Sequence, residues 1–323
     1  MKTGFSARAH RSRTEALLSV LAFDGVTKLF GAFTAVDDLS FEVPEGEVFG
    51  FLGPNGAGKT TSLRMTLDIL RPTAGSIEVL GGPPGRRMAG EIGFLPEERG
   101  LYGQMGVLET VVYFGRLKAM SAQAARSAGQ ALIERFGLAD FAGQKVQRLS
   151  KGMAQKVQLA AALVTTPRLL ILDEPFAGLD PVNQSVLEAV ILDLARSGST
   201  VVFSTHVMQH AERLCDRLML IARGRKVFQG TQGEARARLP ARLSLTALED
   251  PRRLPGVESA TLAGDAGGGW TDWQIALAPG ADADALLEAC TTQGFALRRF
   301  ETHQASLHEV FLHLVGGDPE EGP

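Results

Sequence analysis

Cysteine is scarce in this chain, whose 323 residues include only Cys215 and Cys290. Two isolated cysteines cannot build a disulfide framework, so we expect a reducing, cytosolic location. An excess of one charge is also missing, since 33 basic and 36 acidic residues leave a formal net charge of -3. A chain with this balance has no general electrostatic attraction for nucleic acid, so no nucleic-acid partner is expected.

Long apolar runs are missing as well. The sequence has no run of the roughly eighteen apolar residues that a membrane-spanning helix needs, so we expect that the chain cannot cross a bilayer by itself. The N-terminal residues 1–21 begin with a basic stretch that lacks the apolar core of a secretory signal, and residues 317–323 are acidic. We expect both segments to be disordered tails, and a role at a membrane surface is the alternative for the basic one.

A glycine-rich segment is the most informative feature that the chain does have. Residues 53–60 read Gly-Pro-Asn-Gly-Ala-Gly-Lys-Thr and fit the phosphate-binding pattern G-x-x-x-x-G-K-S/T. The apolar residues 48–52 predict a buried strand before the loop, and residues 61–70 predict a helix after it. A loop between a strand and a helix is the context that this pattern requires.

The residue types of the loop suit a bound phosphate. Glycines let the backbone turn with its amides inward, so that N–H groups can surround a phosphate at the positive end of the next helix. Lys59 adds a point charge for the outer phosphates, and the Thr60 hydroxyl is placed to hold Mg2+. We predict that the nucleotide is held by Gly53, Asn55, Gly56, Ala57, Gly58, Lys59, Thr60 and Thr61.

A second element indicates nucleotide hydrolysis. The continuous apolar run 169–172 is typical of a strand buried on both faces of a parallel sheet, and it ends in Asp173 and Glu174. Ligands of open α/β sheets bind at the carboxyl ends of the strands. Asp173 can therefore hold Mg2+, while Glu174 faces the water that attacks the γ-phosphate.

Further motifs resemble one family of phosphate-loop proteins. Residues 149–153 read Leu-Ser-Lys-Gly-Met and resemble the L-S-G-G-Q signature of the ATP-binding cassette (ABC) ATPases. The segments 172–175 (Leu-Asp-Glu-Pro), 178–181 (Gly-Leu-Asp-Pro) and 204–206 (Ser-Thr-His) follow in the order and spacing of that family. The resemblance covers about residues 23–230 and rests on the ordered combination of motifs.

The resemblance implies roles for single residues. Phe30 is similar to the aromatic residue that stacks on adenine, although a core phenylalanine is the alternative and Phe33 lies close by. Glu174 is similar to the carboxylate that orients and helps to deprotonate water, and His206 to the histidine that contacts the γ-phosphate. By the same resemblance, Ser150, Gly152 and Asp180 contribute to ATP binding.

The chain departs from the family pattern at several positions. Lys151 and Met153 replace a glycine and a glutamine of the signature, and Ala177 stands where a serine is frequent. Glu97 replaces the usual glutamine that touches Mg2+ and couples to a membrane partner, but a carboxylate still binds a hard cation. The segment around Glu97 resembles a branch of bacterial export ATPases that includes sodium-extrusion and drug-resistance members.

A zinc site at His206 and His210 is the alternative for these histidines, because two residues four apart can share a helical face. A protease-type zinc helix needs a glutamate after the first histidine, and Val207 stands there. We therefore do not expect this metal site.

The expected fold is α/β. It is a phosphate-loop ABC ATPase cassette at residues 22–233, with a mixed sheet core and a helical subdomain within 105–147, followed by a small α+β domain at 234–316. In that last domain, strand-like segments at 242–248, 270–277 and 296–302 alternate with helix-like segments at 283–292 and 307–315. Its spacing resembles an accessory domain of the same export branch.

The resemblance also implies partners. The signature closes over ATP held by another cassette, so we expect a second copy of the chain in a homodimer, or a paralogous cassette. Transport further requires an integral membrane permease in a separate chain, which would hold this chain on the cytoplasmic, inner face of the cell membrane. The function expected is an ATP-binding and ATP-hydrolysing subunit that energises export.

A soluble mechanical ABC ATPase acting on nucleic acid or ribosomes is the alternative. Repair members of the family carry a long coiled-coil insertion and translation members carry two cassettes, whereas this chain has one cassette without sustained heptads. A GTPase is disfavoured because no N-K-x-D motif is present.

Overall fold

The computed structural model describes residues 19–98, 100–240 and 242–316, which belong to two compact units. The first unit contains the chain up to Phe49 together with Gly58–Ser204 and Arg223–Arg225. The second contains Gly50–Ala57, Thr205–Ala222 and the chain from Lys226 onward. Of the two expected tails, residues 1–18 and 317–323 lie outside the described residues. Residues 19–21 are part of a strand, which corrects the predicted boundary at residue 21.

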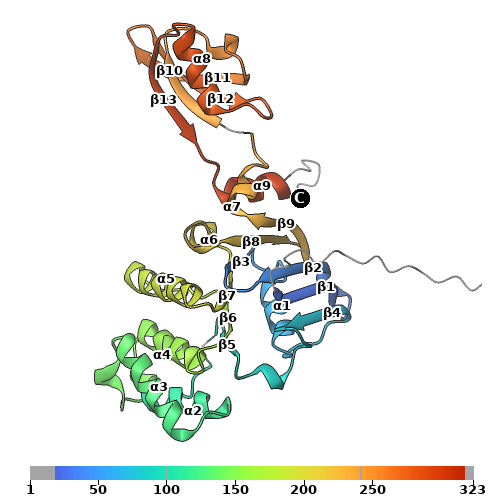
Figure 1. The fold of residues 1–323 in the computed structure, drawn as a ribbon, viewed down its shortest axis with the longest axis vertical. Helices are drawn as coiled ribbons and strands as arrows, with labels where there is room; N and C mark the ends of the chain where they lie inside the picture. Colours follow the sequence, from blue (N-terminus) through green and yellow to red (C-terminus); the bar gives the residue numbers. More distant parts are fainter. Residues whose placement is uncertain (1–18, 99, 241, 317–323) are drawn as a thin grey trace, which may run out of the picture. The chain divides into compact units, whose positions relative to one another are not determined.

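A three-stranded antiparallel sheet in the first unit was not predicted from the sequence (Figure 1). Its strand order is β2-β1-β4, with β1 at Ser19–Phe30, β2 at Phe33–Pro44 and β4 at Ala74–Val79. Phe23 of β1 and Phe41 of β2 are register partners, and their rings stack with centroids 4.6 Å apart. Such cross-strand aromatic pairs stabilise a sheet.

A six-stranded sheet has the order β5-β6-β7-β3-β8-β9. The strands are β3 (Val48–Leu52), β5 (Ile92–Leu95), β6 (Leu169–Asp173), β7 (Thr200–Thr205), β8 (Arg217–Ala222) and β9 (Arg225–Thr231). β5, β6 and β7 run parallel, and every residue of β3, β6 and β7 is buried. The buried strands predicted at 48–52 and 169–172 are therefore confirmed.

Within its described residues, the first unit contains five helices (Figure 1). They are α1 (Lys59–Thr66), α2 (Val107–Leu117), α3 (Ala122–Arg135), α4 (Lys151–Leu163) and α5 (Pro181–Arg196), with short 3-10 turns η1 (Arg86–Met88), η2 (Ala139–Phe141) and η3 (Val146–Arg148). α2, α3 and α4 pack against one another, as expected for a helical subdomain. α1 ends four residues before the predicted residue 70, because Asp68 adopts a left-handed conformation with φ 56°.

The second unit contains the accessory domain with a four-stranded antiparallel sheet of order β11-β12-β10-β13. Besides strands of the six-stranded sheet, the second unit contains α6 (Met208–Leu214), α7 (Gln232–Arg236), β10 (Arg242–Ala247), η4 (Pro251–Arg253), β11 (Val257–Gly267), β12 (Trp270–Leu277), α8 (Ala283–Thr292), β13 (Leu297–His303) and α9 (Leu307–Val315). Leu286 and Cys290 of α8 join Leu243, Leu245 and Ile275 of the sheet in one buried cluster.

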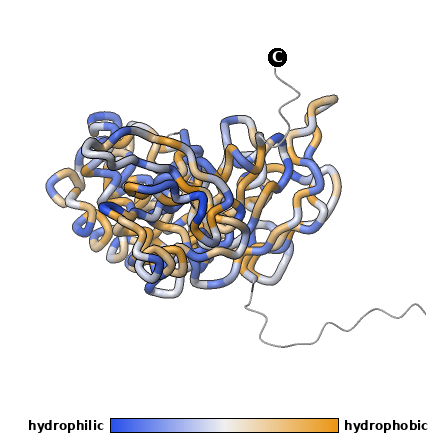
Figure 2. The backbone as a smooth tube through the Cα atoms, turned by 90° about the horizontal axis from the view of Figure 1, so that it is seen from above, coloured by the Kyte–Doolittle hydropathy of each residue, from blue (hydrophilic) through white to orange (hydrophobic). Residues whose placement is uncertain are grey.

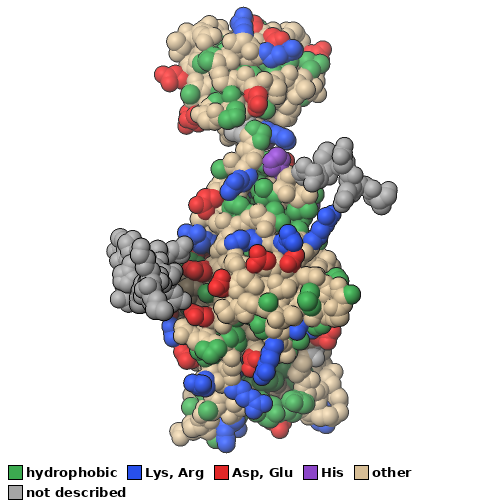
Figure 3. Space-filling view, turned by 90° about the vertical axis from the view of Figure 1, so that its right-hand side faces the viewer, with side chains coloured by type: hydrophobic (Ala, Val, Ile, Leu, Met, Phe, Trp, Pro, Cys, Tyr) green, Lys and Arg blue, Asp and Glu red, His purple; other side chains and the backbone are tan. Residues whose placement is uncertain are grey.

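The elements predicted for this domain are confirmed, but β11 was missed. The strand continues to Gly267, and the turn to β12 lies at Gly267–Gly269, where all three φ angles are positive. Apolar and polar stretches alternate along the backbone (Figure 2). On the face drawn in Figure 3, basic and acidic side chains are interspersed, which agrees with the small net charge. Within the described residues, no helix combines the length and apolarity needed to cross a membrane.

Candidate active site

Two glycines of the phosphate-binding loop have neighbours that exclude a side chain. A Cβ atom on Gly53 would lie 2.2 Å from the Ile221 carbonyl oxygen, and one on Gly58 would lie 2.6 Å from the Ala35 carbonyl oxygen. Gly58 also has φ 102°, a conformation that favours glycine, and it directly precedes α1. The loop therefore depends on glycine at both positions, as the sequence pattern predicts.

Lys59 and Thr60, in the first turn of α1, meet the two acids at the carboxyl end of β6. Lys59 Nζ lies 3.3 Å from Glu174 Oε1, and the two side chains are only 5% and 9% exposed. Thr60 Oγ1 donates a hydrogen bond of 3.1 Å to Asp173 Oδ1. The structure therefore brings together the two motifs that the sequence placed 113 positions apart.

Ser204, at the end of β7, joins the same cluster. Its hydroxyl donates to Asp173 Oδ1 at 2.6 Å and accepts from the Glu174 backbone N–H at 3.0 Å. Ser204 is fully buried. In the sequence, Ser204 is part of the Ser-Thr-His motif, which predicts no role for it. The missing information was the strand register, in which Asp173 and Ser204 are direct partners.

Glu174 has an uncommon backbone conformation. Its φ angle is 46°, in the left-handed region that non-glycine residues rarely occupy. Such residues are found at functional sites, where the surrounding structure maintains them. Here the bond from the Glu174 N–H to Ser204 and the ion pair with Lys59 both contribute.

Ser150 and Asp180 each begin a helix. Ser150 accepts a hydrogen bond from the Met153 N–H at the start of α4, and Asp180 accepts one from the Asn183 N–H at the start of α5. The bonds from Asn183 hold the pKa of Asp180 below its usual value. A Cβ atom on Gly152 would lie 3.0 Å from Asn183 Nδ2, so little space is left there. The contacts of Ser150, Gly152 and Asp180 with ATP stay predictions.

Phe30, at the end of β1, lies on the surface. It is 47% exposed, so the alternative of a core phenylalanine is wrong. Lys28 Nζ lies 5.1 Å from the centre of the Phe30 ring, at a distance typical of a cation–π contact. Phe33 is 63% exposed, so both aromatic rings are accessible to a ligand. Stacking on adenine stays a prediction for Phe30.

The remaining residues that the sequence predicted for the site differ in their exposure to solvent. His206 is exposed and lies before α6, whereas His210 is buried within that helix, so the two do not share a helical face. Within the described ranges, no group of three or more His, Cys, Asp or Glu side chains could hold a metal ion. Glu97 is exposed on the segment after β5, and in the loop Asn55 is exposed, Ala57 buried and Thr61 half-buried. Their roles stay predictions.

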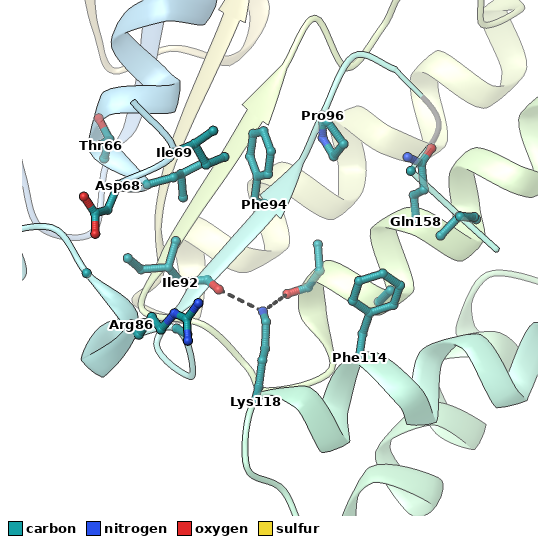
Figure 4. Close-up of a pocket in the computed structure, with 17 residues that line it drawn as sticks. Thr66, Asp68, Ile69, Arg86, Ile92, Phe94, Pro96, Phe114, Lys118 and Gln158 are labelled. Carbon is teal, nitrogen blue, oxygen red and sulfur yellow. Dashed lines mark hydrogen bonds between the residues drawn. The ribbon is translucent and has the colours of Figure 1, made fainter. Parts of the chain in front are cut away.

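A cavity of about 470 Å³ lies in the first unit and is lined by parts of β5, α2 and α4 (Figure 4). Its walls include Ile69, Phe94 and Phe114. Lys118 Nζ donates to the carbonyl oxygens of Ile92 at 2.8 Å and Ala162 at 3.4 Å (Figure 4). Burial lowers the pKa of Lys118 to about 8. Pro96 and Gly100, on either side of Glu97 in the sequence, also line this cavity.

The fold and these side chains define a class of protein. A glycine loop joins a buried strand to a helix, the first turn of that helix carries Lys59 and Thr60, and both side chains face an acid pair at the carboxyl end of a parallel strand. This arrangement is that of a phosphate-loop nucleotide hydrolase.

Comparisons with known proteins give the family. The ABC transporter family model matches residues 36–177, and a model described as ATP-binding protein DrrA1-3-like, C-terminal domain, matches residues 236–315. The chain is 39% identical over 305 residues to the ABC transporter ATP-binding protein YhaQ of Bacillus subtilis (strain 168), covering 92% of this chain and 99% of that protein. It is 34% identical to the daunorubicin resistance ATP-binding protein DrrA3 of Streptomyces coeruleorubidus, covering 93% and 97%.

Two further comparisons indicate the same family. The Nod factor export ATP-binding protein I of Mesorhizobium japonicum is 37% identical, with 93% of this chain and 87% of that protein covered. A solved ATP-binding subunit of an ABC transporter matches with a TM-score of 0.63 at 27% identity, covering 68% of this chain and 93% of that chain.

The chain belongs to the family of ABC transporter ATP-binding proteins. It is an ATP-binding subunit with the ATPase activity that drives transport, and its relatives include proteins of the export branch that the sequence resembles. The predicted family, fold class and ATPase function are thereby confirmed.

Proposed function

We propose that this chain energises export through a separate membrane permease by hydrolysing ATP in complex with Mg2+. The observation that carries this proposal is the buried cluster of Lys59, Thr60, Asp173 and Glu174. The direction of transport rests on the relatives named for drug resistance and Nod factor export. Those relatives give no support for a mechanical ATPase that acts on nucleic acid or ribosomes.

In this proposal, each residue in or near the cluster has a separate role in hydrolysis. The loop amides of 53–58 and the Lys59 ammonium bind the phosphates, and Thr61 adds its hydroxyl. The Glu174 carboxylate orients the attacking water and accepts its proton, while His206 contacts the γ-phosphate. Once ATP phosphates are bound, Lys59 has a second anionic partner besides Glu174.

The donor set fits Mg2+. Thr60 and Asp173 offer hard oxygen donors, and their hydrogen bond of 3.1 Å brings both side chains to one point. Glu97 would supply a further carboxylate from the segment after β5. Bound Mg2+ supplies charge neutralisation on the outer phosphates.

A second cassette completes the site in this proposal. Ser150 and Gly152 at the start of α4, and Asp180 at the start of α5, would face ATP that is held by another copy or by a paralogous chain. The positive end of α4 is suited to a phosphate. Phe30 would stack on the adenine of its own ATP. Residues 19–233 would form this cassette and residues 234–316 an accessory domain.

The permease would dock at the cavity that Figure 4 shows. Ile69 is 57% exposed, and the cavity is also lined by Pro96 and Gly100, which lie on either side of Glu97 in the sequence. A partner in this cavity would therefore touch the segment that we assign to Mg2+ and water. The chain would then lie in the cytoplasm on the inner face of the cell membrane.

Isolation of the tagged chain from gently solubilised native membranes tests the proposal. The wild type and Glu174→Gln, with ATP present, are expected to bring down a multi-span membrane protein in stoichiometric amount. Ile69→Glu should lose that protein while the isolated chain keeps its ATPase activity. Leu117→Glu is the matched control, because Leu117 is 62% exposed on α2. Ribosomes or nucleic acid in place of a membrane protein would overturn the proposal.

A further inference from the structure

We propose that Ser204 is a positioning residue for ATP hydrolysis, because one hydroxyl fixes both the Asp173 carboxylate and the Glu174 backbone. The inference rests on the roles proposed above for these two acids. Ser204 itself would touch neither ATP nor the attacking water.

The direction of the hydrogen bonds at Ser204 is determined by its partners. The Glu174 backbone N–H can only donate, so the Ser204 oxygen accepts that bond at 3.0 Å. The Ser204 hydroxyl then donates a hydrogen bond of 2.6 Å to Asp173 Oδ1, because a carboxylate can only accept. The serine is thus held in one orientation.

Asp173 Oδ1 accepts two hydrogen bonds, one from the Ser204 hydroxyl and one from the Thr60 hydroxyl. Among the described residues, no side chain donates to the other oxygen, Oδ2. The two hydroxyls therefore distinguish the carboxylate oxygens. Oδ1 is held by the protein, and Oδ2 keeps its lone pairs for a hard cation.

The second bond of Ser204 supports Glu174. A left-handed φ of 46° is unfavourable for this residue, and the Glu174 N–H is held by a serine that is fully buried. A buried N–H without an acceptor is unfavourable, so loss of the hydroxyl favours a different Glu174 backbone. The Glu174 carboxylate, 3.3 Å from Lys59, would then move from its position.

Ser204→Ala removes the hydroxyl, Ser204→Thr restores it, and Ser199→Ala is the matched control. Ser199 directly precedes the same strand, is 7% exposed, and donates its hydroxyl proton to the Pro167 carbonyl oxygen at 2.8 Å. We expect Ser204→Ala to lower kcat at least about tenfold, since small displacements of positioned groups have effects of this size, with KM for ATP changed less than about threefold. Ser204→Thr should recover most of kcat, and Ser199→Ala should keep it.

Two measurements separate positioning from a general loss of structure. The gain in equilibrium ATP affinity on adding Mg2+ should shrink in Ser204→Ala and stay unchanged in Ser199→Ala. In a Glu174→Gln background, Ser204→Ala should lower the residual hydrolysis much less than in the wild type, because the two residues act as one unit.

Full turnover with a normal Mg2+ effect in Ser204→Ala overturns the inference, as do additive losses in the Glu174→Gln background. If Glu174→Gln itself keeps near-normal turnover, the proposed base is wrong instead. The two failures are therefore distinguishable.

Discussion

Lys59 Nζ and Glu174 Oε1 form an ion pair of 3.3 Å between two side chains that are 5% and 9% exposed. Removing one partner of a buried pair leaves the other charge in a medium that solvates it poorly. The pair therefore links the phosphate binding that we propose for Lys59 to the position of the Glu174 carboxylate.

Lys59→Ala is expected to abolish nucleotide binding, because the loop loses its charge for the outer phosphates. Titration with a fluorescent ATP analogue measures this loss directly. Lys145→Ala is the control, since Lys145 is exposed and donates a hydrogen bond to Gln104 Oε1 at 3.0 Å. Wild-type affinity in Lys59→Ala would contradict the loop assignment.

Glu174→Gln should bind ATP and associate with a second cassette but lower kcat at least about 100-fold, because the amide cannot accept the proton of water. Steady-state phosphate release and size-exclusion chromatography with ATP test both parts. The exposed α3 residue Glu134, changed to Gln, should leave both unchanged. Near-normal turnover in Glu174→Gln would exclude this residue as the base.

His206→Ala is expected to lower turnover at least about tenfold with smaller effects on ATP affinity, because the imidazole would act on the γ-phosphate. His313→Ala, in the exposed part of α9, provides the comparison. If both variants hydrolyse ATP at the wild-type rate, His206 has no part in turnover.

Phe30→Ala should weaken ATP binding roughly fivefold or more, since stacking of a base on an aromatic ring contributes about 1–3 kcal/mol. Phe30→Tyr should restore it. Phe33→Ala is the matched comparison, because Phe33 is the register partner of Phe30 and is also exposed. A larger loss in Phe33→Ala would assign the adenine contact to that ring.

Lys118 predicts a pH dependence of stability. Burial lowers its pKa from 10.5 to about 8, so between these pH values the unfolded chain binds more protons than the folded one. The contribution of Lys118 to the free energy of unfolding should therefore rise with pH in this interval. Denaturant unfolding of the wild type against Lys118→Met should show this slope. A pH-independent difference would contradict the lowered pKa.

Several elements could not be predicted from the sequence for identifiable reasons. β11 has small and polar residues where an alternating strand has large apolar ones, and its pairing with β12 supplies the missing stabilisation. The end of α1 was placed too late because the apolar spacing continues past Asp68, where the backbone turns. Local periodicity does not contain these tertiary effects.

The candidate site likewise contains residues that the sequence predicted and a residue that it did not. Lys59, Thr60, Asp173 and Glu174 were found because each lies in a local pattern that joins a strand to its following loop. Ser204 was missed because its role depends on the register between β6 and β7, and that register leaves no mark in a single sequence. Phe30 needed its exposure to exclude the core alternative.

The sequence by itself determined the glycine loop, the buried strands, the acid pair and the order of the motifs, because these depend on residue types and spacing along the chain. The tertiary structure alone decided that Lys59 pairs with Glu174 and that Ser204 holds Asp173. Those contacts join residues far apart in the chain, and the packing of helix α1 and the register of parallel strands bring their atoms within bonding distance.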